Sequence, residues 1–409
     1  FGELAEHAFD TPRITAQELN EKIKNKENMV ILDGRPYTEY RKMSIPTAMC
    51  CPNGELPLRI DDIVTSPETT IVINCAGRTR SIIGAQTLIN LGIKNKVLAL
   101  ENGTQGWYLA DFALDHGAVK RHPLTVDPAA AKQRQARARE LAKKHHVPFV
   151  SGEQVQKWLA QTDRTTFLCD VRTPEEFAQG SIPGAQHTPG GQLVQATDQY
   201  VGVRGARLVL FDSDGARAPA MASWLAMLGW EVAVCDDALQ FNWNQTASSN
   251  AVVKTALEKI SATQLKDVLA SETPVLDLRV STKYREGHVR GSKWTIRPLL
   301  ANQTFLKGKS VVLFVDDIVV AELAALDLIE LGVSNVRVCM ATKEQCVAAG
   351  LEWVATPDEP TDAQSIDYLF FVHDRHDGNK AAARQYLAWE MNLLAQIDEQ
   401  ERDAFKLPH

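Results

Sequence analysis

The sequence lacks several features that would each indicate a particular class of protein. Its seven cysteines are odd in number and include no Cys-x-x-Cys pair, which argues against a disulfide framework and a zinc site. No apolar run approaches the roughly 18–20 residues of a membrane helix, so we expect no membrane partner. An excess of positive charge is also missing, because the formal net charge is −7, and this argues against nucleic acid as a partner. We therefore expect a cytoplasmic protein with reduced thiols and with neither a metal nor a cofactor.

The most informative stretch is the Cys75 loop, which reads Cys75-Ala76-Gly77-Arg78-Thr79-Arg80-Ser81. The apolar residues 70–74 before it predict a buried strand, and residues 82–89 after it predict a helix. The first backbone N–H groups of a helix have no intrahelical partners. Together with the helix dipole and two arginines they are expected to stabilise a thiolate, and they would also bind a sulfur oxyanion or a phosphate. The loop therefore predicts a nucleophilic cysteine with its own anion pocket.

Three similar segments organise the chain. Each begins with an apolar strand that ends in Asp-x-Arg, at residues 29–35, 166–172 and 274–279. A second strand in each segment, at residues 71–74, 208–211 and 311–314, is followed by a helix that closes on Leu-Gly. Arg172 lies 137 residues after Arg35, and Arg217 lies 137 residues after Arg80. The first two copies therefore align without a net gap, and the third is shorter.

Strands and helices alternate within each copy, which predicts an α/β protein whose mainly parallel sheets are covered by helices on both faces. Ligands bind such sheets at the carboxyl ends of the strands, where Cys75 lies. The predicted domains are residues 10–120, 147–247 and 256–356, with a helical linker at 121–146 and an extension at 357–409. The extension is expected to contain a strand at 368–372 and a helix from about residue 380 to 399. The basic, alanine-rich residues 128–144 are interpreted as a solvated linker helix and not as an RNA-binding one.

The beginning of the chain leaves one matter open. No signal peptide is recognisable, although the sequence begins at Phe1 and not at Met. The sequence leaves open whether an N-terminal piece precedes Phe1, so targeting is undecided. One interpretation of Phe1 to Phe9 is the tail of a preceding repeat, and this also stays open.

The motifs of the three copies carry a family resemblance. Asp-x-Arg after the first strand, the Ile-Pro-Gly-Ala turn at residues 182–185, the Cys75 loop and the segment from Leu100 to Trp107 together resemble rhodanese homology domains. The resemblance implies three tandem domains, each with a parallel five-stranded sheet. It also implies sulfane-sulfur transfer through a persulfide on Cys75, from a donor such as thiosulfate to cyanide, a thiol or sulfite. A protein is a further candidate acceptor, and thiosulfate sulfurtransferase is the expected activity.

Roles in the Cys75 loop follow from this chemistry. Cys75 is the expected nucleophile, Arg78 and Arg80 would hold the sulfonate of the donor, and the loop amides would stabilise the persulfide. Gly77 would allow a tight turn, and Ser81 would either cap the helix or donate to the persulfide. Asp33 and Arg35 are interpreted as structural supports, and Trp107 as a core residue. The predicted substrate-binding residues are Ala76, Gly77, Arg78, Thr79, Arg80 and Ser81.

Loop length separates two enzyme classes. Phosphatases with related folds use Cys-x5-Arg, whereas Arg80 follows Cys75 in a Cys-x4-Arg pattern that matches the sulfurtransferases. A phosphatase or arsenate reductase remains the weaker enzyme alternative. The alternative outside enzymology is a sulfur carrier or scaffold with little turnover.

The other two copies depart from the pattern. Asp212 stands at the cysteine position of the second copy, although Arg217 matches Arg80. In the third copy Val315 takes the cysteine position and Val320 the arginine position. A carboxylate or an apolar side chain cannot form a persulfide, so both copies are predicted to be non-catalytic.

The remaining cysteines and one polar cluster have simpler interpretations. The apolar runs that contain Cys169, Cys235 and Cys339 predict that these thiols are buried. Cys50 and Cys51 are adjacent, and a redox or sulfur-relay role stays open for them. The segment from His373 to Asp377 is similar to a metal site at first sight, but it is interpreted as polar loop chemistry.

Overall fold

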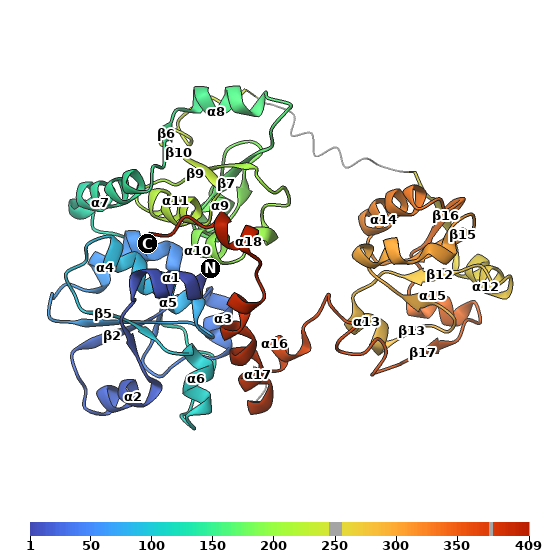
Figure 1. Ribbon diagram of the computed structural model, residues 1–409, viewed down its shortest axis with the longest axis horizontal. Coiled ribbons are helices and arrows are strands. Elements are labelled where there is room, and N and C mark those ends of the chain that lie inside the picture. The colour runs from blue at the N-terminus through green and yellow to red at the C-terminus, as the bar shows by residue number, and fades with distance from the viewer. Residues whose placement is uncertain (245–255, 376–378, 409) are drawn as a thin grey trace. The chain divides into compact units, whose positions relative to one another are not determined.

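The computed structural model describes residues 1–244, 256–375 and 379–408. The chain divides into two compact units. The first unit is Phe1–Ser248 together with Arg375–His409, and the second is Ser249–Asp374. The first two copies of the repeat lie in the first unit, and the third copy forms the second unit (Figure 1).

The first copy is built on a five-stranded parallel sheet. Its strands have the order β1-β5-β4-β2-β3. The centre of β4 is buried on both sides, because Val72 packs into the core on one face and Ile71 and Ile73 into the core on the other. Its elements are α1 (Gly2–Phe9), β1 (Arg13–Ile14), α2 (Ala16–Lys24), β2 (Met29–Asp33), α3 (Tyr37–Lys42), β3 (Met49–Cys50), α4 (Leu56–Ile63), β4 (Thr70–Asn74), α5 (Thr79–Asn90), β5 (Val97–Leu100) and α6 (Gly103–Leu109).

The second copy repeats this arrangement. Its strand order is β6-β10-β9-β7-β8, which corresponds position by position to the first sheet, and all four strand pairs are parallel. Its elements are β6 (Phe149–Val150), α8 (Gly152–Leu159), β7 (Thr166–Asp170), α9 (Pro174–Gln179), β8 (Gln186–His187), α10 (Gly190–Gln195), β9 (Arg207–Phe211), α11 (Arg217–Met227) and β10 (Glu231–Cys235).

The third copy has the same sheet with one addition. Its parallel strands follow the order β11-β16-β15-β12-β14, and a separate antiparallel pair joins β13 to β17. The predicted class of three α/β domains with five-stranded parallel sheets is therefore confirmed. The elements are β11 (Glu258–Ile260), α12 (Ala262–Ala270), β12 (Val275–Asp277), α13 (Ser281–Glu286), β13 (His288–Val289), β14 (Lys293–Trp294), β15 (Ser310–Phe314), α14 (Ile318–Glu330), β16 (Asn335–Cys339), α15 (Lys343–Ala348) and β17 (Trp353–Val354).

Each Asp-x-Arg motif forms a buried ion pair at the end of a strand. In the first copy Arg35 donates through Nε and Nη2 to the two carboxylate oxygens of Asp33, at 2.9 and 2.7 Å. Nη2 also donates to the carbonyl oxygen of Met43, eight residues further on. The second and third copies repeat both contacts. Such bidentate pairs fix geometry as well as charge, which agrees with the structural role predicted for Asp33 and Arg35.

The linker segment is helical as predicted, but it is not fully solvated. Helix α7 (Ala131–Lys144) buries Ala138, Leu141 and Ala142, since small side chains let it pack closely against α11. Arg134 and Arg137 of the same helix pair with the carboxylates of Asp61 and Asp62 in α4. These arginines are therefore engaged within the protein.

The C-terminal extension differs from the prediction. The strand expected at residues 368–372 is wrong, because α16 (Phe370–Asp374) is a short helix. A brief apolar run has no periodicity that separates strand from helix. The following helix is also shorter than expected and breaks into α17 (Lys380–Met391) and α18 (Glu399–Ala404). The tail then returns to the first unit, where the Lys406 amide donates to the Met227 carbonyl at 2.7 Å.

Two further expectations concern metals and membranes. His376 and Asp377 of the polar cluster lie outside the described residues. Elsewhere in the described ranges, no group of three or more His, Cys, Asp or Glu side chains is arranged to hold a metal ion. Among the helices that the structure describes, none is both long and apolar enough to cross a membrane.

Candidate active site

Cys75 lies at the carboxyl end of β4, the central strand of the first sheet. The loop after it is held by the start of α6, where the amides of Thr104 and Gln105 donate to the carbonyls of Cys75 and Ala76 at 2.8 and 3.0 Å. Gly103 has φ +50°, and a Cβ there would lie 2.3 Å from the Cys75 carbonyl oxygen. Only glycine therefore fits at this contact. Trp107, which belongs to the same helix, packs in the hydrophobic core of the first copy, as predicted.

Ser81 contacts the Cys75 thiol directly. Its hydroxyl Oγ donates to Cys75 Sγ at 3.2 Å. The N-cap position of α5 is Arg78, which makes no side-chain capping bond. Of the two roles considered for Ser81, the structure therefore shows the contact with sulfur and not the helix cap.

Arg80 and Ser81 favour a Cys75 thiolate as expected, but the net shift of the pKa is upward. Cys75 is only 2 % exposed, and burial raises the pKa of its thiol above the ordinary value. Arg80 and the hydrogen bond from Ser81 lower this pKa, whereas the carboxylate of Glu390 raises it further. Burial is the largest of these effects, so the pKa of the thiol rises overall.

These arginine pairings are specific. The two terminal nitrogens of Arg80 donate to the two carboxylate oxygens of Glu39 at 2.8 and 2.9 Å. Arg78 turns to helix α1, where it contacts Glu3 and Glu6 at 2.6 Å each. Helix α1 thus engages the Cys75 loop. Sulfonate binding by Arg78 and Arg80 stays a prediction, and both guanidinium groups are already paired in this structure.

A residue of another helix, which the sequence analysis did not identify, contacts the Cys75 loop directly. Glu390 of α17 accepts hydrogen bonds through Oε1 from the amides of Arg78 and Thr79, at 3.4 and 3.2 Å, and from Thr79 Oγ1 at 3.1 Å. A Cβ at Gly77 would lie 2.3 Å from Glu390 Oε2 and 2.8 Å from Tyr386 Cε1. Gly77 therefore permits the close approach of α17, which lies beside α6 in Figure 1. No local motif signals a partner more than three hundred residues away.

The same C-terminal segment brings a cation and a cavity to the site. The guanidinium of Arg375 lies 3.7 Å from the centre of the Tyr386 ring and is buried. A cavity of about 930 Å³ adjoins the loop, and its wall includes Thr79, Arg80, Tyr386 and Glu390. The first copy and the C-terminal segment therefore meet at the Cys75 loop, and the cavity beside it is also lined by residues of the second copy.

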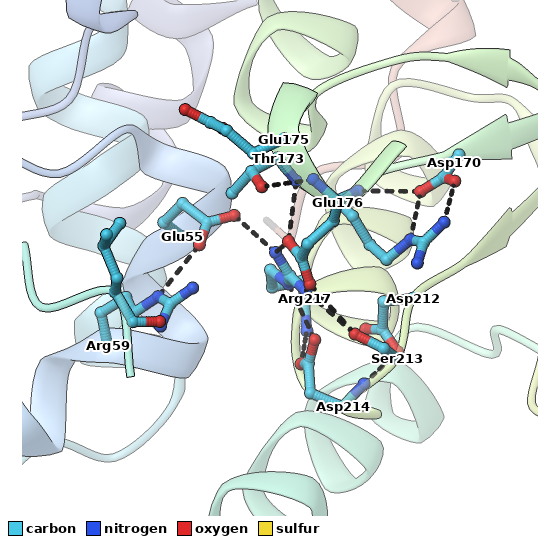
Figure 2. Close-up of polar contacts among 12 residues, drawn as sticks. Glu55, Arg59, Asp170, Thr173, Glu175, Glu176, Asp212, Ser213, Asp214 and Arg217 are labelled. Carbon is cyan, nitrogen blue, oxygen red and sulfur yellow. Dashed lines mark hydrogen bonds and ion pairs between the residues drawn. The ribbon is translucent and has the colours of Figure 1, made fainter. Parts of the chain in front are cut away.

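The corresponding loop of the second copy is filled by its own carboxylate. Asp212 accepts hydrogen bonds from the amides of Gly215 and Ala218 at 2.6 Å each, and from Asp214 at 3.2 Å. Burial and the neighbouring Asp214 raise the pKa of Asp212 to about 7, while Arg217 and the amides oppose this rise. Figure 2 shows Arg217 surrounded by carboxylates. Its guanidinium contacts Glu176, Asp214 and, across to the first copy, Glu55 at 2.7–2.8 Å.

The third copy offers an apolar loop. Val315 is buried in the core of this unit, and Val320 packs partly buried against the same core. Neither residue can act as a nucleophile or hold an anion. The sequence predicted that this copy has no nucleophile, and the structure shows that the corresponding position lies in an apolar environment.

The other cysteines are all free and buried. This confirms the burial predicted for Cys169, Cys235 and Cys339. Cys50 and Cys51 belong to cores on opposite faces of the first sheet. Burial, followed by the nearby Asp33, raises the pKa of Cys50 to about 12. The surroundings of Cys50 therefore favour an inert thiol.

Comparisons with known proteins agree with this architecture. The family model of the Rhodanese-like domain matches residues 15–110 and 151–240, one match in each of the first two copies. The fold and the motifs define the class: the chain belongs to the rhodanese family. The crystal structure of thiosulfate sulfurtransferase from Pseudomonas aeruginosa is similar over 100 % of this chain and 78 % of that one, with 37 % identity and a TM-score of 0.77.

A curated relative widens the functional range. The "Putative sulfur carrier protein YrkF" of Bacillus subtilis is 31 % identical over 103 residues, which is 25 % of this chain. The match spans 54 % of that relative, so the chain covers about half of its length. At the level of the family, the protein is a sulfurtransferase or a sulfur carrier.

Proposed function

We propose that this protein moves sulfane sulfur from thiosulfate or a similar donor to cyanide or a thiol through a persulfide on Cys75. The observation that carries the proposal is the Cys75 thiol at the strand end, with Ser81 Oγ 3.2 Å from its sulfur and Arg80 among its nearest charges. The Cys-x4-Arg spacing and the 37 % identity to a thiosulfate sulfurtransferase support the same chemistry.

The reaction takes place in two displacements. The Cys75 thiolate attacks the outer sulfur of thiosulfate, a new S–S bond forms, and the S–S bond of the donor breaks so that sulfite leaves with the electron pair. An acceptor such as cyanide then attacks the outer sulfur of the persulfide. Thiocyanate leaves and the Cys75 thiolate is regenerated, so no external oxidant or reductant is needed. Ser81 Oγ would donate to the charged sulfur in both states.

A second candidate function is a sulfur carrier with slow turnover. The observations that favour it are the 2 % exposure of Cys75 and the contact of Glu390 with the loop amides. A buried, largely protonated thiol reacts slowly with small donors. The two candidates share the persulfide and differ in the rate at which free acceptors release it.

Mass spectrometry of the intact protein after incubation with several donors tests both candidates. The expected result is an adduct of one sulfur atom that is lost in Cys75→Ser and retained in Cys169→Ala, a matched change at another buried cysteine of the same unit. Rapid thiocyanate formation by the wild type would favour the enzyme, and a stable adduct with slow release would favour the carrier. Absence of the adduct with every donor, or robust phosphoester turnover, would overturn the proposal.

A further inference from the structure

The carboxylate of Glu390 occupies part of the anion-binding loop. It accepts hydrogen bonds from the amides of Arg78 and Thr79, which lie at the N-terminal end of α5. These amides are among the groups that would receive the negatively charged end of a sulfur donor in the proposed mechanism. Glu390 therefore stands where an anionic substrate would compete with it.

The second oxygen of this carboxylate has no evident structural purpose. Glu390 is 5 % exposed, and its Oε2 is buried without a hydrogen-bond partner among the residues that the structure describes. A buried carboxylate oxygen without a partner lowers stability, and glutamine at this position would keep the Oε1 contacts without the charge. Packing alone therefore does not account for a charged residue here.

Glu390 also lies close to the Cys75 thiol. Oε2 lies where a Cβ on Gly77 would be only 2.3 Å away, two residues after Cys75. The Glu390 charge acts on the Cys75 thiol itself. A donor bound for attack by Cys75 would consequently lie close to this negative charge.

We propose that Glu390 is a specificity-determining residue for the sulfur donor. Its charge disfavours a doubly negative donor such as thiosulfate and favours donors of lower charge, namely persulfides of thiols. This inference rests on the proposed function, because it concerns the same loop and the same transfer. A donor gains the loop amides only when the Glu390 carboxylate leaves them.

Binding of thiosulfate provides the test, measured by calorimetry with full-length protein in a Cys75→Ser background so that no turnover occurs. Removing one like charge a few ångströms from the ligand in Glu390→Gln should tighten the Kd about tenfold. Glu390→Asp keeps the charge and should bind as weakly as the parent. Glu399→Gln, an exposed glutamate on the same tail, is the matched control and should change nothing.

Kinetics with an otherwise native loop supply a second readout. In Glu390→Gln the KM for thiosulfate should fall about tenfold with little change in kcat, and the preference for thiosulfate over a thiol persulfide should rise accordingly. Glu390→Ala offers a second neutral variant in case Glu390→Gln folds poorly.

The outcomes separate this inference from the proposed function. Thiosulfate affinity within about twofold of the parent in both neutral variants would refute the role of Glu390, even if Cys75 forms its persulfide. Equal tightening in Glu390→Asp would assign the effect to packing and would also refute it. Tighter binding in the neutral variants without any persulfide on wild-type Cys75 would support the role of Glu390 as an internal anion and refute the proposed transfer.

Discussion

Removing the Ser81 hydroxyl should raise the pKa of the Cys75 thiol. Ser81 Oγ donates to Sγ at 3.2 Å inside a buried site, and this contact stabilises the thiolate more than the thiol. A hydrogen bond to a charged acceptor contributes about 1.5–3 kcal/mol, and if about 1.4 kcal/mol of it distinguishes thiolate from thiol, the pKa rises by about one unit in Ser81→Ala. At a fixed pH below that pKa, the thiolate population should therefore fall about tenfold.

The measurement is the rate of Cys75 alkylation by iodoacetamide between neutral and alkaline pH. The Cys75 peptide is quantified by mass spectrometry, since six further thiols are present. Because burial raises the wild-type pKa above its ordinary value, the wild-type rate should still rise beyond pH 9, and Ser81→Ala should follow the same curve at higher pH.

A matched control is Ser213→Ala, which alters a serine in the corresponding loop of the second copy. This change should leave the Cys75 curve in place. An unchanged or lowered pKa in Ser81→Ala would refute the argument, because it would mean that the hydroxyl does not favour the thiolate. A loss of rate that persists at the alkaline plateau would instead indicate a displaced thiol.

Two further predictions concern the second copy. Arg217→Met leaves the carboxylates of Glu55, Glu176 and Asp214 without their buried partner, so urea unfolding should show a loss of about 3–5 kcal/mol. Lys157→Met, at an exposed ion pair of the same copy, should leave the urea midpoint unchanged. The pKa of Asp212 is raised to about 7, so folding favours its protonated form, and stability should decline as the pH rises from about 4 through about 7. Asp212→Asn should flatten this decline in thermal melts, and an equally steep decline in the variant would contradict the assignment to Asp212.

The repeat explains why so much of the fold follows from the sequence. The 137-residue offset aligns the first two sheets, and it also relates pairs that sequence reasoning did not single out. Arg80 pairs with Glu39, and at the same offset Arg217 pairs with Glu176. Local patterns therefore identify strands, helices and the position of the nucleophile.

The properties that could not be predicted depend on contacts between distant segments. Glu390 contacts the loop although it lies more than three hundred residues later in the sequence. The sequence predicted its helix within the C-terminal extension but predicted no contact between that extension and the site. The state of the Cys75 thiol depends on this cover, because burial and Glu390 raise its pKa against the effect of Arg80. The sequence shows the two arginines of the loop, but it does not show which carboxylates pair with them in the folded protein.

The Cys75 loop of the first copy and the Asp212 loop of the second copy differ by more than the loss of a cysteine, because the carboxyl group in each loop has a different origin. In the second copy the carboxyl group of Asp212, at the cysteine position itself, accepts hydrogen bonds from two amides at 2.6 Å, so the group that fills the loop belongs to the loop. In the first copy the anion comes from another helix and makes amide contacts of 3.2 and 3.4 Å. Longer hydrogen bonds from a separate element are easier to break than short ones within a single loop. The second loop is therefore filled by one of its own residues, whereas in the proposed mechanism a substrate would replace Glu390 in the first loop.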